Sequence, residues 1–521
     1  MGHMGLHHPD DVNSDARQNR VLILGAGVYQ VPLIKKSREM GFYTIICSIR
    51  GNYPGFQYAD KYSYTNTVDR EAVLQLARNE KIDAILTTGT DVAVSTIGYV
   101  CDQLGLKGIT EQSAAWVTNK LEMKRRFFHL AGYQEIEDDH IVVEQPIIIQ
   151  NEIGYLSIIC KVIDGCLNFL MQAKIEPGNV NVIQISPTLQ ATKSNFTRKH
   201  GGNSPKYLDY FLDASKYQIL ADQIQSEQGT RFYKKRNRNI IIMVEDDIPE
   251  LDSHRWMTLG QIKELMKFNN LVNMDTRTVI SCLPYTYDEK TSENTALMQL
   301  LPNEALYRSI FKKPDYVLMH QVFNNINDHK MFSRSSSRLL PLKSLKSWKM
   351  DKREIVCRIP YDFKVVFCHV EIEEREVNYW EQPLIQATEP AVIGLFSCVD
   401  DGIRKYLVCV KHELGCFDQV ELGPTLQLQP SLSYLYMNSV ESLFIRTLNA
   451  GKGILHDVFL SEEGGRFYHE ENRNVIIDID KNAVERPDGY FWMDFATIAE
   501  MIQFNNCVNS QLRNLMSIID I

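Results

Sequence analysis

The stretch SEQGTRFYKKRNRNIII at residues 226–242 returns as SEEGGRFYHEENRNVII at residues 461–477, displaced by 235 positions (461 − 226 = 235). Three further blocks return in the same order and at nearly the same displacement. They are EQPIIIQ (144–150) as EQPLIQA (381–387), SPTLQ (186–190) as GPTLQ (423–427), and Trp256 with NNLVNMDTR (269–277) as Trp492 with NNCVNSQLR (505–513). A period this long predicts two homologous domains, because solenoid repeats are only 20–50 residues long.

Each copy has the sequence pattern of an α+β domain. In the first copy, apolar runs at 156–162, 167–173 and 180–185 are separated by short Asp-Gly or Pro-Gly turns, which predicts adjacent antiparallel strands. A helical stripe runs from Leu208 to Leu220, a buried strand covers 239–244, and Thr258 with Gln261 forms a capping box. We assign the first domain to 126–336 and the second to 337–521, with a connection at about 284–338.

The chain before the first copy has the pattern of a small parallel α/β sheet. VLILGAG, from Val21 to Gly27, is followed by a helical stretch and the apolar run TIIC (44–47), and a second unit covers 81–110 with a short strand at 104–110. The glycines suggest a dinucleotide site, but Gln30 stands at the third glycine position and Ser48 where a ribose-binding carboxylate is expected. A structural tight turn remains the alternative.

Composition narrows the class of protein. The 521 residues carry 56 Lys and Arg against 65 Asp and Glu, a net charge of −9, which disfavours a surface that tracks nucleic acid. The 11 cysteines are scattered without a Cys-x-x-Cys pair, which favours reduced thiols in a cytoplasm over disulfides or structural zinc. No apolar run reaches membrane-spanning length, so we expect no membrane span. We expect residues 1–20 to be a disordered tail.

The two copies differ most in their polar residues. Seven polar residues of the first copy have no polar counterpart in the second, or none that aligns clearly: Gln172, Asn179, Asn181, Ser186, Thr192, Asn195 and His200. The segment RFYKKRNR (231–238) carries five positive side chains, whereas RFYHEENR (466–473) carries two arginines and two glutamates. A basic cluster of this kind suits a diphosphate, although a solvated surface is the alternative. We therefore expect the functional site in the first copy.

Two resemblances to known families follow from these motifs. GAGVYQVPLI, NYPGFQYADKY, TTGTDVAV, LGLKGIT and TNKLEMKRRF, between residues 22 and 127, resemble the Rossmann-like domain that precedes the catalytic part of ATP-grasp ligases of the carbamoyl-phosphate synthetase type. That resemblance implies an α/β pre-ATP-grasp domain at 21–125. The ATP site of those ligases lies in the residues that follow, and here the chain changes character near residue 130.

QAKIEPGNVNVIQISPTLQATKSNFTRKHGG, QSEQGTRFYKKRNRN and RWMTLGQIKELMKFNNLVNMDTRTVISCL resemble the nucleotide-diphosphate 4-keto-6-deoxyhexose 2,3-dehydratases of deoxysugar pathways. The resemblance covers about 126–521. It implies two tandem Nudix-like repeats, the first active and the second largely vestigial. It also implies a dTDP-linked 4-keto-6-deoxy sugar as substrate and no cofactor. We expect a downstream 3-ketoreductase, a homodimer, and no nucleic-acid or membrane partner.

The chemistry of such a dehydratase needs a base, an acid and a partner for an oxyanion. The C4 ketone acidifies the C3 hydrogen, and the enolate then expels the C2 hydroxyl. We assign Glu176 as candidate base, His200 as candidate acid or alternate base, and Lys174 or Asn181 as oxyanion partner. Lys174 and Glu176 return as Lys411 and Glu413, so a structural ion pair is the alternative. The residues expected to bind substrate are Gln172, Asn179, Asn181, Gln190, Thr192, Asn195, Arg231, Lys235, Arg236 and Arg238.

Other functions are less compatible with the sequence. A Nudix hydrolase needs several carboxylates on one helix to hold magnesium, and the helix TLGQIKELMKF has only Glu264. We therefore expect no metal site. A non-catalytic nucleotide-sugar binding or regulatory protein, or a remnant of an ATP-grasp ligase, would also account for the tandem copies and the leading domain.

Overall fold

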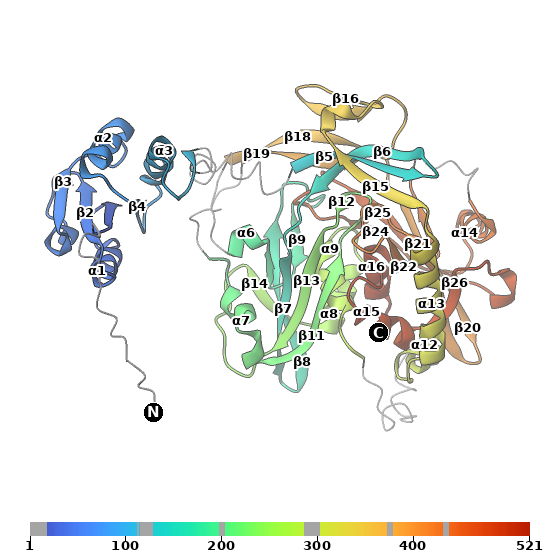
Figure 1. Ribbon diagram of the computed structural model, residues 1–521. Helices are drawn as coiled ribbons and strands as arrows, with labels where there is room; N and C mark the ends of the chain where they lie inside the picture. The colour runs from blue at the N-terminus through green and yellow to red at the C-terminus, as the bar shows by residue number, and fades with distance from the viewer. Residues whose placement is uncertain are drawn as a thin grey trace, which may run out of the picture. The chain divides into compact units, whose positions relative to one another are not determined.

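The computed structural model describes residues 18–111, 114, 129–196, 204–285, 303–371, 379–430 and 437–520, and it divides the chain into two compact units, Met1–Arg126 and Phe127–Ile521 (Figure 1). The predicted tail at 1–20 falls almost entirely outside the described residues.

The first unit is built on a parallel sheet with strand order β3-β2-β1-β4. The strands are β1 (Arg20–Leu24), β2 (Tyr43–Ser48), β3 (Lys61–Tyr64) and β4 (Ala84–Leu86), joined through α1 (Val31–Glu39), η1 (Pro54–Tyr58), α2 (Arg70–Glu80) and α3 (Val94–Leu104). The strand expected at 104–110 is absent. Gly105, with φ +64°, instead ends α3 in a left-handed turn, as a glycine can.

Gln30 occupies the place where a dinucleotide-binding turn has its third glycine. Its side chain is buried and donates through Nε2 to the Thr88 carbonyl. A Cβ added to Gly25 or Gly27 would lie only 3.0 Å from this side chain. The amide of Gln30 therefore fills the space over the two glycines, an arrangement that fits the tight-turn interpretation.

The second unit contains two seven-stranded sheets of matching topology. The first sheet has the order β11-β13-β7-β8-β14, with β10 paired to β7 and β9 to β8. Its strands are β7 (Gly154–Ile163), β8 (Cys166–Ile175), β9 (Ile183–Ser186), β10 (Leu189–Ala191), β11 (Gln218–Ser226), β13 (Arg236–Met243) and β14 (His254–Thr258). The prediction of a helical stripe up to Leu220 is wrong at its end. The helices α7 (Leu208–Leu212) and η2 (Ala214–Lys216) end before Gln218, where β11 begins.

The other sheet has the order β22-β21-β20-β25-β24, with β23 paired to β20 and β26 to β21. Its strands are β20 (Val392–Asp400), β21 (Ile403–His412), β22 (Val420–Gly423), β23 (Leu426–Leu428), β24 (Ile454–Ser461), β25 (Glu471–Asp478) and β26 (Tyr490–Asp494). The register repeats as well as the order. Gln172 lies opposite Ser186 in the first sheet, and Cys409 lies opposite Gly423 in the second, the same pairing displaced by the repeat.

Two smaller four-stranded sheets, β12-β6-β5-β15 and β16-β17-β18-β19, complete the strands. They comprise β5 (His129–Glu137), β6 (His140–Ile149), β12 (Phe232–Tyr233), β15 (Ser335–Leu340), β16 (Trp348–Met350), β17 (Glu354–Cys357), β18 (Phe363–Glu371) and β19 (Tyr379–Ala387). β15 crosses the boundary predicted at 336/337 and pairs with β5, the first strand of the first copy.

The helices of the two copies share one core. The predicted capping box is confirmed at Thr258, which begins α8 (Leu259–Met266). α9 (Met274–Ser281) packs against its counterpart α16 (Ser510–Ile518) in the middle of the unit (Figure 1). The remaining helices are α6 (Lys193–Phe196), α12 (Glu304–Ile310), α13 (Tyr316–Phe332), α14 (Ser439–Asn449), α15 (Phe495–Ile502), η3 (Leu342–Ser344) and η5 (Lys481–Ala483). Buried residues from both sheets form one shared cluster, and each copy also has a buried cluster of its own.

Candidate functional site

Each copy inserts the turn that follows its Lys-x-Glu strand end into a loop of the other copy. The Gly178 N–H donates to the Gly464 carbonyl at 2.8 Å, and the His469 N–H donates to the Gly178 carbonyl at 2.9 Å. A Cβ on Gly178 would lie 1.6 Å from the Phe467 carbonyl oxygen, so only glycine fits there. On the opposite side, the Lys234 N–H donates to the Gly415 carbonyl at 2.6 Å. The two copies are thus joined by an approximately reciprocal exchange.

Two buried arginines hold these loops in place. Arg277 donates to the Ser461 carbonyl at 2.6 Å, and Arg513 donates to the Ser226 carbonyl at 2.5 Å. Ser461 and Ser226 begin the two copies of the repeated block. The arginines, conserved between the copies, therefore connect α9 to the second copy and α16 to the first.

The end of β8 places Lys174 and Glu176 beside each other. Their charged groups lie 3.0 Å apart, and Glu176 is buried. Gln190 on β10 donates to the same carboxylate at 3.1 Å, and its own oxygen accepts from Ser186 at 3.1 Å. Asn273, at the start of α9, donates to Ser186 at 3.0 Å. A polar network therefore fixes one carboxylate at the mouth of the first sheet.

The second copy forms the opposite wall of this site. Gly465 lies close to two carboxylates, because a Cβ there would lie 2.9 Å from Glu463 Oε1 and 3.5 Å from Glu176 Oε1. Arg466 donates to the Gln150 side chain at 3.2 Å. We call the assembly of Lys174, Glu176, Gln190, Lys235, Glu463 and Arg466 the Glu176 cluster. It is built from both copies.

Burial perturbs the acids and bases in and around this cluster. It raises the pKa of Glu463 to about 7, with Arg466 opposing the shift and Glu176 adding to it. It lowers the pKa of the Lys235 ammonium, which donates to the Glu152 carbonyl at 2.6 Å, and raises the pKa of Glu227. Burial also holds the pKa of Asp275 well above its usual range. Glu463 can therefore exchange a proton near neutral pH.

A cavity of about 650 Å³ lies at the equivalent place in the second copy. It is lined by the Lys411–Leu414 strand end, by Thr230 and Arg231 of the first copy, and by 141–145 of β6. Asn509 donates to Glu413 at 2.7 Å, and His412 lies 2.5 Å from Glu135, whose hydrogen bond raises the pKa of the imidazole. We call it the Glu413 pocket. It shows that a Lys-x-Glu strand end opposite an arginine loop can border a ligand-sized space.

The structure does not gather the predicted basic cluster into one surface. Arg231 is buried, packs over the Phe363 ring and lines the Glu413 pocket, 3.9 Å from Glu470. Arg236 lies over the Phe417 ring, and Arg238 binds Asp222 through two contacts of 2.6 and 2.5 Å. Of the four predicted cations, only Lys235 lies in the Glu176 cluster. Arg231 and Lys235 lie outside the strands, whereas Arg236 and Arg238 lie on β13, so these neighbours in sequence enter different surroundings.

The other predicted site residues do not belong to the Glu176 cluster. Gln172 lies on β8 opposite Ser186, and buried Asn179 donates to the Val182 carbonyl at 3.1 Å. Exposed Asn181 donates to the carbonyls of residues 269 and 270 at 3.1 and 3.2 Å, contacts that tie two loops together. Thr192 precedes α6, which contains Asn195, whose side chain is not described; His200 lies outside the described residues.

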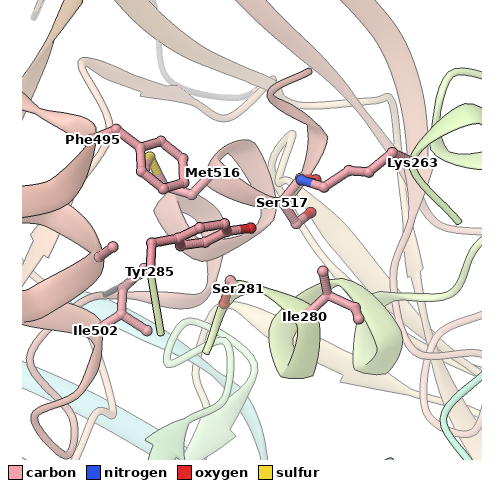
Figure 2. Close-up of a pocket in the computed structure, with 9 residues that line it drawn as sticks. Lys263, Ile280, Ser281, Tyr285, Phe495, Ile502, Met516 and Ser517 are labelled. Atoms are coloured by element: carbon pink, nitrogen blue, oxygen red, sulfur yellow. The ribbon is translucent and has the colours of Figure 1, made fainter. Parts of the chain in front are cut away.

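A second, closed cavity lies near the chain's last helix. It measures about 10 Å³, close to the space of one water molecule, so it cannot hold a sugar. Figure 2 shows the Lys263 amine reaching to Ser517, with the rings of Tyr285 and Phe495 also facing the cavity. Burial lowers the pKa of Lys263 to about 7. The amine donates to the carbonyls of Ser517 and Ile519, which gives it a structural role.

Within the described ranges, no three His, Cys, Asp or Glu side chains are grouped so as to hold a metal ion. No helix in the described part of the chain is long and apolar enough to cross a membrane.

The second unit thus contains two copies of one mixed α and β arrangement, with a cluster of ionisable side chains between the copies. The family model described as NDP-hexose 2,3-dehydratase matches residues 103–283 and 319–519, so the chain belongs to that family. A protein of Saccharopolyspora spinosa named dTDP-4-dehydro-6-deoxy-α-D-glucopyranose 2,3-dehydratase is 36% identical over 77% of this chain and 83% of its own. A protein of the same name from Amycolatopsis orientalis is 35% identical over 80% and 84%.

Solved structures with some likeness include two enzymes with synthetase names. Phosphoribosylglycinamide synthetase from Anaerococcus prevotii is 20% identical, covers 32% of this chain and 51% of its own, and has a TM-score of 0.21. N5-carboxyaminoimidazole ribonucleotide synthetase from Thermotoga maritima is 16% identical, covers 26% and 42%, and has a TM-score of 0.19. Likenesses at these TM-scores carry no argument about the chain.

The sequence analysis missed the residues that the second copy supplies. Glu463 stands where the first copy has Gln228, and Gly465 stands where it has Thr230. Both differences lie inside the block that reveals the repeat. They are a signal in the sequence, because the second copy gains a carboxylate at Glu463 besides losing polar residues elsewhere.

Proposed function

We propose that this protein removes water across C2 and C3 of a dTDP-linked 4-keto-6-deoxyglucose, giving a 2,6-dideoxy-3,4-diketo sugar. The observation that carries the proposal is the carboxylate of Glu176, fixed by Lys174 at 3.0 Å and Gln190 at 3.1 Å opposite a second acid, Glu463. The substrate is the one that the names of the similar proteins contain.

In this proposal, Glu176 removes the C3 proton, and the Lys174 ammonium stabilises the charge that develops on the C4 oxygen. Elimination of the C2 hydroxyl then forms a C2–C3 double bond and restores the C4 ketone. The resulting 3-enol tautomerises to the diketone. These electrostatic effects are stronger at a site lined by buried groups than in water, because the effective dielectric constant there is lower.

Loss of the C2 hydroxyl from dTDP-4-keto-6-deoxyglucose, followed by mass spectrometry after borohydride trapping, tests the proposal. We expect turnover by the purified chain and a loss of at least about 10²-fold in E176Q. The matched control is E413Q, which makes the same change in the equivalent strand end. Binding of the sugar nucleotide without turnover by the unaltered chain would favour a non-catalytic binding protein and reject the proposal.

Further proposals follow from the resemblance and the arrangement of the chain. We propose that both halves of the second unit are Nudix-like domains of about 126–336 and 337–521, and that residues 21–125 form a pre-ATP-grasp-like domain without a catalytic role. Lys235, with Arg466, supplies positive charge toward the diphosphate. The enzyme would be a cytoplasmic homodimeric lyase, and a 3-ketoreductase would consume its unstable diketone.

A further inference from the structure

The second copy differs from the first at two positions that face Glu176. Glu463 replaces Gln228, and Gly465 replaces Thr230, in an otherwise well-matched block. Gln228 and Thr230 belong to the loop that walls the Glu413 pocket, and Thr230 lines that pocket directly. The equivalent loop at the Glu176 cluster therefore has an added carboxylate and a missing side chain. Both changed positions lie on the loop that faces Glu176, the candidate base of the first copy.

The side chain that Gly465 lacks would lie beside both carboxylates. A Cβ at position 465 would lie 2.9 Å from Glu463 Oε1 and 3.5 Å from Glu176 Oε1. Any larger side chain would therefore crowd both carboxylates. The loop is rigidly placed, because the Gly464 carbonyl accepts from Gly178 at 2.8 Å and the Gly465 carbonyl accepts from Gln382 at 2.9 Å.

Glu463 differs from the other acids near it in its surroundings. Glu227 is buried and accepts from Asn237 at 2.5 Å, and Glu462 is buried and accepts from Asn472 at 2.6 Å. Glu463 is only half-buried as a whole residue, whereas Glu227 and Glu462 are buried. Its pKa, raised by burial to about 7, is compatible with a carboxylic acid that still holds its proton at neutral pH.

We infer that Glu463, supplied by the second copy, is the catalytic acid that protonates the departing C2 hydroxyl in the Glu176 cluster. This inference rests on the proposed function and replaces His200 in that role. Glu176 takes the C3 proton, and the electron pair of the C3–H bond becomes the enolate. The C2–O bond then breaks as the C2–C3 double bond forms, and the hydroxyl leaves as water with the Glu463 proton. The two carboxyls hold one proton between them before and after, and solvent exchange returns it to Glu463.

Deuterium exchange at C3 separates the two carboxylates. In D₂O with dTDP-4-keto-6-deoxyglucose, E463Q is expected to lose dehydration by roughly 10²- to 10⁴-fold while it still exchanges the C3 hydrogen. E176Q is expected to lose both reactions. E463D, which keeps a proton donor, should dehydrate the substrate at least about tenfold faster than E463Q. E413Q, the matched control, should dehydrate at the unaltered rate, and all variants should keep the wild-type melting temperature within a few degrees.

Three outcomes would overturn the inference. Dehydration by E463Q within threefold of the unaltered chain would show that Glu463 is not needed. Loss of C3 exchange to the same extent as dehydration would place Glu463 at the first step. Retained exchange with lost dehydration in H200A, beside an active E463Q, would return the acid role to His200. Absence of dehydration by the unaltered chain would instead reject the proposed function, so the two failures are distinguishable.

Discussion

A single titration at Glu463 is expected to shape the pH profile of catalysis. If this residue is the acid, it must be protonated, so kcat should fall as pH rises through about 7, the value to which burial raises its pKa. The charged groups that act on it or on its partner Glu176 come from several elements, and they are Lys174, Glu227, Lys235, Asp275 and Arg466. The residual activity of E463Q should not show this fall in kcat at alkaline pH. If E463Q keeps the fall, another titrating group causes it.

A second titration concerns stability. The pKa of buried Lys263 is lowered to about 7, below its unfolded value near 10.4. Between these values the unfolded chain binds more protons than the folded one, so Lys263 makes stability rise with pH, by up to about 1.4 kcal/mol per pH unit. Below pH 7 the slope from this residue disappears. Urea unfolding of K263M should lack that component. Equal slopes for K263M and the unaltered chain between pH 7.5 and 9.5 would contradict this.

At the scale of elements, our proposal assigns the reaction to the strand end that faces the Glu463 loop. G465T copies into the second copy the residue that the first copy has at Thr230, and it should place a side chain beside Glu463 and Glu176. We expect kcat/KM to fall by roughly 10²-fold or more, because the reacting carbons lose their position. Steady-state kinetics test this prediction. T230G makes the reverse change at the Glu413 pocket and should leave kcat/KM within threefold.

A G465T variant with normal kinetics would show that the sugar does not enter between the two carboxylates. A melting temperature close to that of the unaltered chain is also expected, since the nearest atom to the added Cβ is the movable end of Glu463. Lost activity together with lost stability would point to misfolding, and G465A then gives the smaller test.

Much of the element pattern follows from local signals in the sequence. The strand pair β7–β8, the buried strand β13 and the cap at Thr258 depend on turns and periodicities a few residues long, and they are confirmed. Ile219 and Leu220 were wrongly placed in a helix, because their apolar character suits a strand equally well. The contact between Glu176 and the Glu463 loop depends on how two copies pack, and no local pattern encodes that arrangement.

At the scale of the whole second unit, the exchange of loops makes the two copies one cooperative body. Their helices share a core, and each copy's buried arginine holds the other copy's loop. The two copies of the repeated block therefore border two different places. The copy at 226–231 borders the Glu413 pocket, and the copy at 461–466 borders Glu176. A defect in the second copy can consequently disable chemistry at residues of the first.

The two arginines separate stability from catalysis. R277M removes the donor to the Ser461 carbonyl, and R513M removes the donor to the Ser226 carbonyl, each leaving buried acceptors unpaired at a cost of about 1–3 kcal/mol per group. In calorimetry we expect both variants to lower the same unfolding transition by several degrees. Well below that temperature, R277M should lose kcat, because Ser461 begins the loop that contains Glu463, whereas R513M should retain most of it. Equal losses in both variants, or two separate transitions for the two copies, would contradict the view that each arginine secures one wall of one site.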